Sequence, residues 1–152
     1  MLRNKQLDVI AFIENDDWYH KDYFRLMTNA WQQHGKPDIF GTRYTIYYHL
    51  FQKAWFTMNH VSRSSAMSTF IKPDLDLTWT VDEDPYTDIH LWMNINNRIT
   101  WKPDFHVCLG MKHGVGKCGG HNHVDQMHRF ENLDSESKFL IETLDEESLK
   151  FY

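Results

Sequence analysis

Residues 12–24 of the chain, FIENDDWYHKDYF, carry an abrupt change from apolar to acidic character. They overlap a short apolar run, DVIAFI at residues 8–13, whose valine and isoleucine content is typical of a strand buried on both faces, as in a parallel sheet. Three carboxylates, Glu14, Asp16 and Asp17, follow at once. In open α/β sheets, ligands bind beyond the carboxyl ends of the strands. The stretch therefore predicts an α/β fold with an acidic site at the end of a strand.

The three carboxylates have two interpretations. Neighbouring carboxylates repel, so each raises the proton affinity of the others, and a divalent cation removes that cost. Mg²⁺ and Mn²⁺ prefer carboxylate and water oxygens and leave positions open for substrate phosphates. The simpler interpretation is a solvated acidic turn that precedes a helix, whose positive N-terminal end favours carboxylates.

The rest of the chain alternates helical and strand patterns. Apolar residues recur at a spacing of three and four from residue 23 to residue 31, which predicts an amphipathic helix that ends at Gly35 and Pro37. The apolar face of this helix comprises Tyr23, Phe24, Met27, Ala30 and Trp31. The other predicted elements are strands at 39–48, 53–59 and 105–110, short helices at 64–70 and 89–96, and a surface helix at about 135–150 with Ser135 or Ser137 as its N-cap. There is no internal repeat and no linker, so residues 1–152 are expected to form one domain.

The composition of the chain excludes several classes of protein. Its 152 residues include 15% aromatic and 24% charged residues, which suits a packed globular domain and argues against disorder. A formal net charge of −5 argues against a nucleic-acid partner. No apolar run is long enough for a transmembrane helix, and the first residues lack the apolar centre of a signal peptide. With two cysteines, Cys108 and Cys118, the chain is expected to be cytoplasmic.

The segment VIAFIENDDWYHKDYF resembles the D-x-D region of GT-A-fold, family-2-like nucleotide-sugar glycosyltransferases. In that family an apolar strand runs into Asp-x-Asp-Asp, then a tryptophan, then a helix that carries a tyrosine. Here Glu14-Asn15-Asp16 occupies the D-x-D positions, with glutamate in place of the first aspartate. The resemblance implies a partial GT-A (Rossmann-like) mixed sheet flanked by helices. It also implies Mn²⁺ or Mg²⁺ bound by Glu14, Asp16 and Asp17, with Asp16 as a direct ligand and Trp18 beside the donor.

A second resemblance concerns the catalytic base. Residues 54–73 look like the acceptor-side segment of the same enzymes, and TDIHLW at 87–92 resembles their Glu-Asp-x-x-Leu-Trp pattern. This resemblance implies that Asp88 is the general base of an inverting reaction, with Glu83 and Asp84 as alternates. The alternative interpretation of Asp88 is the N-cap of a helix.

The segment GMKHGVGKCGGHNHVDQMH, residues 110–128, is rich in glycine and histidine and is expected to be a loop. Its His-Gly step at His113 resembles a late His-Gly segment of these glycosyltransferases. The resemblance implies that His113 contacts the metal or the diphosphate, with His121 and His123 as alternates.

Three other interpretations of this loop stay open. Cys108 or Cys118 could bind zinc together with histidines. The literal His-Asn-His at residues 121–123 suggests an HNH-like, zinc-binding nuclease. The loop could also be an ordinary surface segment.

Taken together, the resemblance implies a metal-dependent glycosyltransferase that moves a sugar from a nucleoside diphosphate sugar to an acceptor hydroxyl. It covers only the second half of a GT-A domain, because the βαβ unit that binds the nucleoside has no counterpart here. We therefore expect a partner chain or a second copy to supply the missing half, or a reduced mode of donor binding. A non-catalytic or split glycosyltransferase-like assembly module is the alternative. In either case the strand at residues 9–12 should present an exposed edge.

Overall fold

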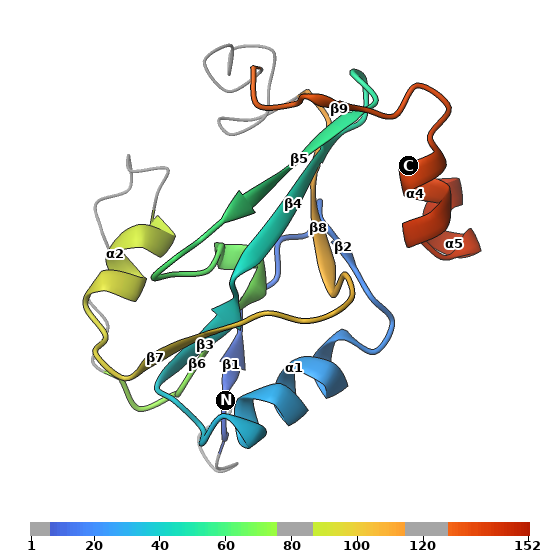
Figure 1. The fold of residues 1–152 in the computed structure, drawn as a ribbon. Helices are drawn as coiled ribbons and strands as arrows, with labels where there is room; N and C mark the ends of the chain where they lie inside the picture. The colour runs from blue at the N-terminus through green and yellow to red at the C-terminus, as the bar shows by residue number, and fades with distance from the viewer. Residues whose placement is uncertain (1–6, 76–86, 115–127) are drawn as a thin grey trace.

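The computed structural model describes residues 7–75, 87–114 and 128–152, which form a mixed α/β structure with two sheets (Figure 1). The strands are β1 (Ile10–Ala11), β2 (Trp18–Tyr19), β3 (Ile39–Thr42), β4 (Tyr44–His49), β5 (Ala54–Asn59), β6 (Thr69–Ile71), β7 (Arg98–Trp101), β8 (Cys108–Lys112) and β9 (Asn132–Leu133). The helices are α1 (Tyr23–Gln33), the 3₁₀ helix η1 (Ala66–Ser68), α2 (Thr87–Met93), α4 (Lys138–Thr143) and α5 (Glu146–Phe151). None of the helices within the described ranges has the length and apolar character needed to cross a membrane. The predicted α/β class is confirmed.

The two sheets share one run of chain. The first sheet has the strand order β1-β6-β3-β7, and the second has the order β2-β8-β4-β5-β9. Only Arg43 separates β3 from β4, so the predicted strand at 39–48 exists but is divided between the sheets. On one side, β6 pairs antiparallel with β3, and β5 pairs antiparallel with β4. On the other side, β7 pairs parallel with β3, and β8 pairs parallel with β4. The pair β3–β4 therefore forms the central run of both sheets, as Figure 1 shows.

Helix α1 packs its apolar face against the first sheet. Tyr23, Met27, Ala30 and Trp31 are buried, as their helical spacing predicts. The chain leaves the helix through Gly35, whose φ of +80° is costly for residues with a Cβ atom. The prediction for Phe24 is wrong, because this side chain is 59% exposed.

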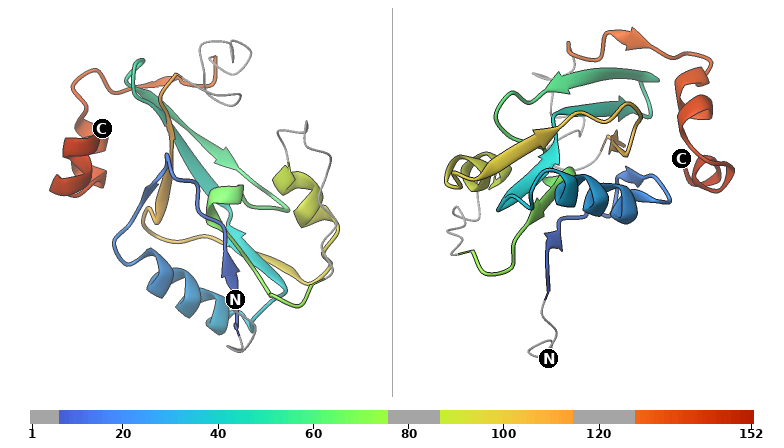
Figure 2. Two further views of the ribbon diagram at one scale, coloured as in Figure 1. Left: turned by 180° about the vertical axis from the view of Figure 1, so that it is seen from behind. Right: turned by 60° about the horizontal axis from the view of Figure 1, so that its bottom comes forward.

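The C-terminal segment covers the second sheet. Leu140 and Leu144 pack into a core cluster with Trp18, Tyr48 and Met111. The single helix predicted at about 135–150 is wrong, since the backbone becomes extended at Leu144 and α4 and α5 are separate helices that lie together beside this sheet (Figure 2). The physical reason is the local chemistry of Asp145, whose side chain accepts a hydrogen bond from the Ser148 N–H and starts a new helix.

Strand β1 differs from its prediction. It has two residues, pairs antiparallel with β6 and lies at the edge of the first sheet, so the expected burial on both faces in a parallel sheet is wrong. Leu7, Ile10 and Ile13 are 46%, 39% and 46% exposed. Among the described strands β1 pairs only with β6, so the expected exposed edge is present.

The remaining predicted elements are present with shifted bounds. The pairing of β5 with β4 and the helix α2 are confirmed. The helix expected at 64–70 is limited to η1, and β6 follows it directly. The strand expected at 105–110 is β8, which begins at Cys108.

Candidate metal centre

The segment between β1 and β2 brings three carboxylates together. Glu14, Asp16 and Asp17, which we call the acidic loop, each offer an oxygen, and these oxygens lie within 4.8 Å of one another. A turn closes the loop, because the Asp17 N–H donates to the Glu14 carbonyl at 3.4 Å. The antiparallel pairing of β2 with β8 then fixes the loop beside the end of β8.

Asp17 is the buried member of the acidic loop. Its Oδ1 accepts a hydrogen bond from the Met111 N–H at 2.8 Å, and the residue is only 8% exposed. Its Oδ2 has no hydrogen-bond partner among the described residues. Burial raises the pKa of Asp17 to about 8, and the charges of Glu14 and Asp16 also act to raise it. Glu14 is half-buried and Asp16 is exposed, so the buried part of the loop is Asp17, whose unpaired oxygen is costly and would be satisfied by a bound cation.

Asp16 faces His113, the residue that follows β8. The His113 Nε2 lies 3.0 Å from the Asp16 Oδ2. Partial burial acts to raise the pKa of Asp16, but the hydrogen bond with His113, a backbone hydrogen bond and the charges of Lys112 and His113 together hold this pKa below its usual value. Helix α5 and the residue that follows it also contact this segment, because the Trp18 Nε1–H donates to the Ser148 Oγ at 3.1 Å and the Tyr152 hydroxyl donates to the Asp16 carbonyl at 3.5 Å.

This set of side chains favours an oxygen-binding cation. Three carboxylates and one imidazole suit Mn²⁺ or Mg²⁺ better than a soft metal. Zinc binding by Cys108 is wrong, because this thiol is buried in the core beside α1. Burial also raises the pKa of the Cys108 thiol, and among the described residues no group of three metal-ligating side chains includes it. Cys118 lies outside the described residues.

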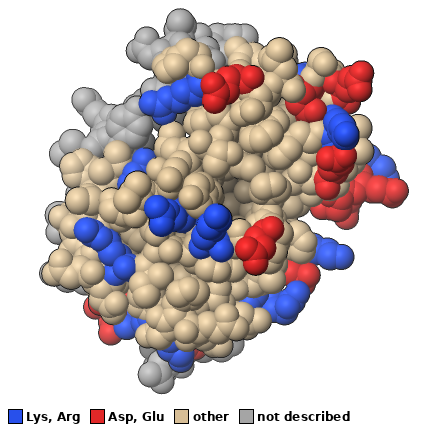
Figure 3. Space-filling view, in the orientation of Figure 1, with Lys and Arg blue, Asp and Glu red and all other residues tan. Residues whose placement is uncertain are grey.

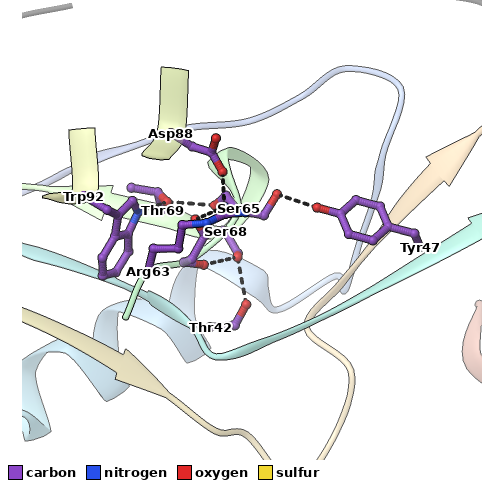
Figure 4. Close-up of polar contacts among 9 residues, drawn as sticks. Thr42, Tyr47, Arg63, Ser65, Ser68, Thr69, Asp88 and Trp92 are labelled. Atoms are coloured by element: carbon purple, nitrogen blue, oxygen red, sulfur yellow. Dashed lines mark hydrogen bonds and ion pairs between the residues drawn. The ribbon is translucent and has the colours of Figure 1, made fainter. Parts of the chain in front are cut away.

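Asp88 belongs to a separate group of polar side chains. It lies in the first turn of α2 rather than at its N-cap, and its Oδ2 is 2.5 Å from Nη1 of Arg63 (Figure 4). Burial raises the pKa of Asp88 above its usual value, although the Arg63 charge acts in the opposite direction. The carboxylate is thus partly buried, paired and more easily protonated than an exposed one.

Tyr47 extends from β4 toward the segment that carries Arg63. Its hydroxyl is 3.1 Å from the Ser65 Oγ, and in Figure 4 the ring points toward Ser65 with Arg63 and Asp88 on the far side. Burial and the charges of Asp88 and the acidic loop raise the pKa of Tyr47, so both groups act on its hydroxyl. The ring needs a glycine beneath it, because a Cβ atom on Gly110 would lie 2.5 Å from the Tyr47 Cδ1.

Hydrogen bonds hold the Arg63 segment against β3. The Ser68 Oγ lies 2.7 Å from both the Thr42 Oγ1 and the Ser64 Oγ. The Thr69 hydroxyl donates to the Ser65 carbonyl at 2.8 Å and accepts from the Trp92 Nε1–H at 3.0 Å (Figure 4). These hydrogen bonds fix the position of the segment that carries Arg63 at one side of the site.

The molecular surface is hollowed on the face seen in Figure 3, with basic and acidic side chains along the lower rim of the hollow. A separate open groove of about 380 Å³ lies between β5 and residues 128–131 and contains none of the residues discussed above.

The structure brings together four of the residues named from the sequence, namely Glu14, Asp16, Asp17 and His113. It places Trp18 in the core at 4% exposure, so the expected position of this ring beside a ligand is wrong. The alternates Glu83, Asp84, His121 and His123 lie outside the described residues.

Sequence reasoning missed Arg63, Tyr47 and Lys112. A signal for the last two exists in the strand alternation, which puts Tyr47 on the same face as Gly110 and Lys112 once β4 and β8 are paired. Comparison with known proteins adds no assignment, because no family model, no curated protein and no solved structure matches this chain.

Proposed function

We propose that this chain is a metal-dependent glycosyltransferase, or its catalytic half, that transfers a sugar from a nucleoside diphosphate sugar to an acceptor hydroxyl. The observation that carries the proposal is the clustering of Glu14, Asp16 and Asp17 around a buried carboxylate oxygen that has no partner among the described residues. The partial GT-A arrangement implied by the sequence belongs to the same proposal.

The acidic loop would hold Mn²⁺ or Mg²⁺. The cation supplies Lewis-acid stabilisation of the departing nucleoside diphosphate. Asp17 offers its unpaired Oδ2, and Asp16 is held in place by His113 at 3.0 Å. Because Asp17 is anchored by the Met111 amide, the ligand geometry is fixed before a cation arrives.

Asp88 would accept the proton of the acceptor. In an inverting displacement the acceptor oxygen bonds to the anomeric carbon, the bond from this carbon to the diphosphate oxygen breaks, and the acceptor proton passes to the base. Burial raises the pKa of Asp88, which favours proton uptake, while Arg63 holds the carboxylate in place.

A partner chain or a second copy of this chain would pair with the open edge of β1. The two-residue strand and the exposed side chains of Leu7, Ile10 and Ile13 support this part of the proposal. Pairing with another strand would satisfy the open edge of β1 and cover apolar surface.

A thermal melt with and without Mn²⁺ tests the metal site. A ligand that binds only the folded state stabilises it by about 2.7 kcal/mol at one hundred times its Kd. Asp17→Asn removes the buried carboxylate at nearly constant volume, so its metal-free midpoint should stay near that of the wild type while its Mn²⁺ shift is lost. Asp16→Asn should lose the shift as well.

The matched control is Asp104→Asn, which neutralises an exposed carboxylate outside the acidic loop and should keep the full shift. The same melts with uridine diphosphate should show a further rise only when Mn²⁺ is present. A wild-type protein that Mn²⁺ does not stabilise, or an equal shift in Asp17→Asn, would rule out the metal-dependent reaction and favour the assembly module.

A further inference from the structure

Lys112 occupies the last position of β8, between the two residues that hold the acidic loop. The N–H of Met111 binds Asp17, and the ring of His113 binds Asp16. The Lys112 side chain extends over the sheet, where its Nζ lies 5.2 Å from the centre of the Tyr47 ring. A cation at this distance from an aromatic face is attracted by the ring, so the ammonium has a defined seat.

The positive charge of Lys112 acts on the carboxylates of the acidic loop, but its ammonium forms no ion pair with these described side chains. This charge acts to lower the pKa of Asp16 and of Asp17, although burial of both groups acts in the opposite direction. Among the described residues, its ammonium forms no ion pair within 4 Å, and its contact is the Tyr47 ring. A half-buried ammonium that is close to carboxylates but not paired with them keeps its donors available for an anion.

We propose that Lys112 is the phosphate-binding residue of this site, with the Tyr47 ring as its support. Its ammonium would contact oxygens of a diphosphate that is bound at the same time by the cation of the acidic loop. The proposal rests on the proposed function, because it names the residue that recognises the leaving diphosphate of that reaction. It places a positive side chain beside the three carboxylates of the acidic loop, which a substrate with several negative charges requires.

A phosphate-binding role and a purely structural role of Lys112 predict different effects on the binding of cations and of diphosphates. A cation bound by the carboxylates is repelled by the Lys112 ammonium, whereas a diphosphate is attracted by it. Lys112→Met should therefore bind Mn²⁺ as well as the wild type or more tightly, and bind a diphosphate more weakly. A residue that only stabilised the fold would weaken both ligands when it is replaced.

Isothermal titration with Mn²⁺, with uridine diphosphate and with both tests the proposal, and uridine serves as the phosphate-free control. Loss of one charge-assisted hydrogen bond should weaken uridine diphosphate binding in Lys112→Met by roughly 10- to 100-fold. Lys112→Arg keeps the charge and should recover most of the affinity. The matched control is Lys102→Met, because Lys102 makes the same kind of contact with a β4 ring, 5.4 Å above Tyr44, and should bind both ligands like the wild type.

Equal diphosphate affinity in Lys112→Met and the wild type would overturn the proposal, as would a parallel loss of Mn²⁺ binding. If the wild type does not bind Mn²⁺, the proposed function fails, and the titration with uridine diphosphate in the presence of EDTA then decides the role of Lys112. Weaker binding in Lys112→Met under those conditions supports the phosphate site. No binding, or equal binding, overturns it.

Discussion

At the residue scale, His60 is a buried histidine three residues before Arg63. It is 4% exposed, and its Nε2 has no hydrogen-bond partner among the described residues. Burial, together with the charge of Arg63, lowers the pKa of His60 to about 4. The ring is therefore neutral in the folded protein over the physiological pH range.

This shift predicts a loss of stability in mild acid. The unfolded chain binds a proton at His60 near the usual histidine pKa of about 6.5, while the folded protein does so only near pH 4. The contribution of His60 is complete above the unfolded pKa and is lost as the pH falls toward the folded pKa. At pH 5 it should have fallen by about 2 kcal/mol. Urea unfolding of wild type and His60→Gln at pH 7 and pH 5 measures it, since the difference between the two proteins should shrink in acid; a constant difference would contradict the shift.

The residues of the acidic loop could be named from the sequence because they are adjacent in it. His113 could be named only through a resemblance. Tyr47 and Lys112 were missed because their approach depends on the parallel register of β4 and β8, which pairs His49 with Lys112 and is not written in any local pattern. Trp18 was placed wrongly, since an indole serves equally well in a core and at a ligand surface.

At the element scale, the side chain of Arg98 caps the C-terminal end of helix α2. This first residue of β7 donates from its Nη1 to the carbonyls of Trp92, Met93 and Ile95 at 2.9, 3.4 and 3.5 Å. A guanidinium at this end also complements the negative end of the helix dipole. Because α2 carries Asp88, the same contacts hold the proposed base in position.

We predict that Arg98→Met destabilises the protein by about 1–2 kcal/mol, which is the usual effect of losing hydrogen bonds from a charged donor. Urea unfolding measures the change. Arg25→Met is the matched control, because Arg25 of α1 makes a surface ion pair with Asp22 and its loss should change stability much less than the loss of Arg98. Equal effects of the two substitutions would show that Arg98 does not cap the helix.

Elements with a strong period were the most predictable ones. Helix α1 follows from the spacing of Met27, Ala30 and Trp31, because that spacing gives one continuous apolar face. The break between α4 and α5 was not visible, since a helix through Leu144 has the same apolar spacing as two helices joined there. The helix breaks there because the Asp145 side chain caps the N-terminus of α5.

At the scale of the whole molecule, β1 forms an open edge of the first sheet in the described structure. Strand β1 leaves one side of its backbone without a strand partner there, next to the exposed Ile10. Such an edge favours pairing with another chain. In a purified sample, the only chain available for this pairing is a second copy of the protein.

We therefore predict concentration-dependent self-association, measured by sedimentation velocity. Ile10→Lys should shift the protein toward the monomer, because a charge on an edge strand opposes pairing. Val61→Lys is the control, since Val61 is 73% exposed but lies away from β1 in the sequence and outside the first sheet. If the wild type stays monomeric at all concentrations, or if both substitutions have an equal effect, the β1 edge does not mediate self-association.

The α/β class was predictable from composition and pattern, while the division into two sheets was not. Residues 39–48 have the composition of one strand, and nothing local marks the point at which its neighbours change. The change occurs because the β5–β6 and β7–β8 segments each cross from one sheet to the other beside Arg43. This is a property of long-range pairing.

The long span between the acidic loop and its anchors has a consequence for biosynthesis. Asp17 leaves the ribosome 94 residues before the Met111 amide that seats it, and Asp16 leaves 97 residues before His113. Until β8 emerges, the three carboxylates have neither their hydrogen-bond donors nor a fixed geometry, and contacts of such large sequence separation form late. A translation product that stalls before residue 111 would thus contain every acidic ligand and still be unable to assemble the cation site.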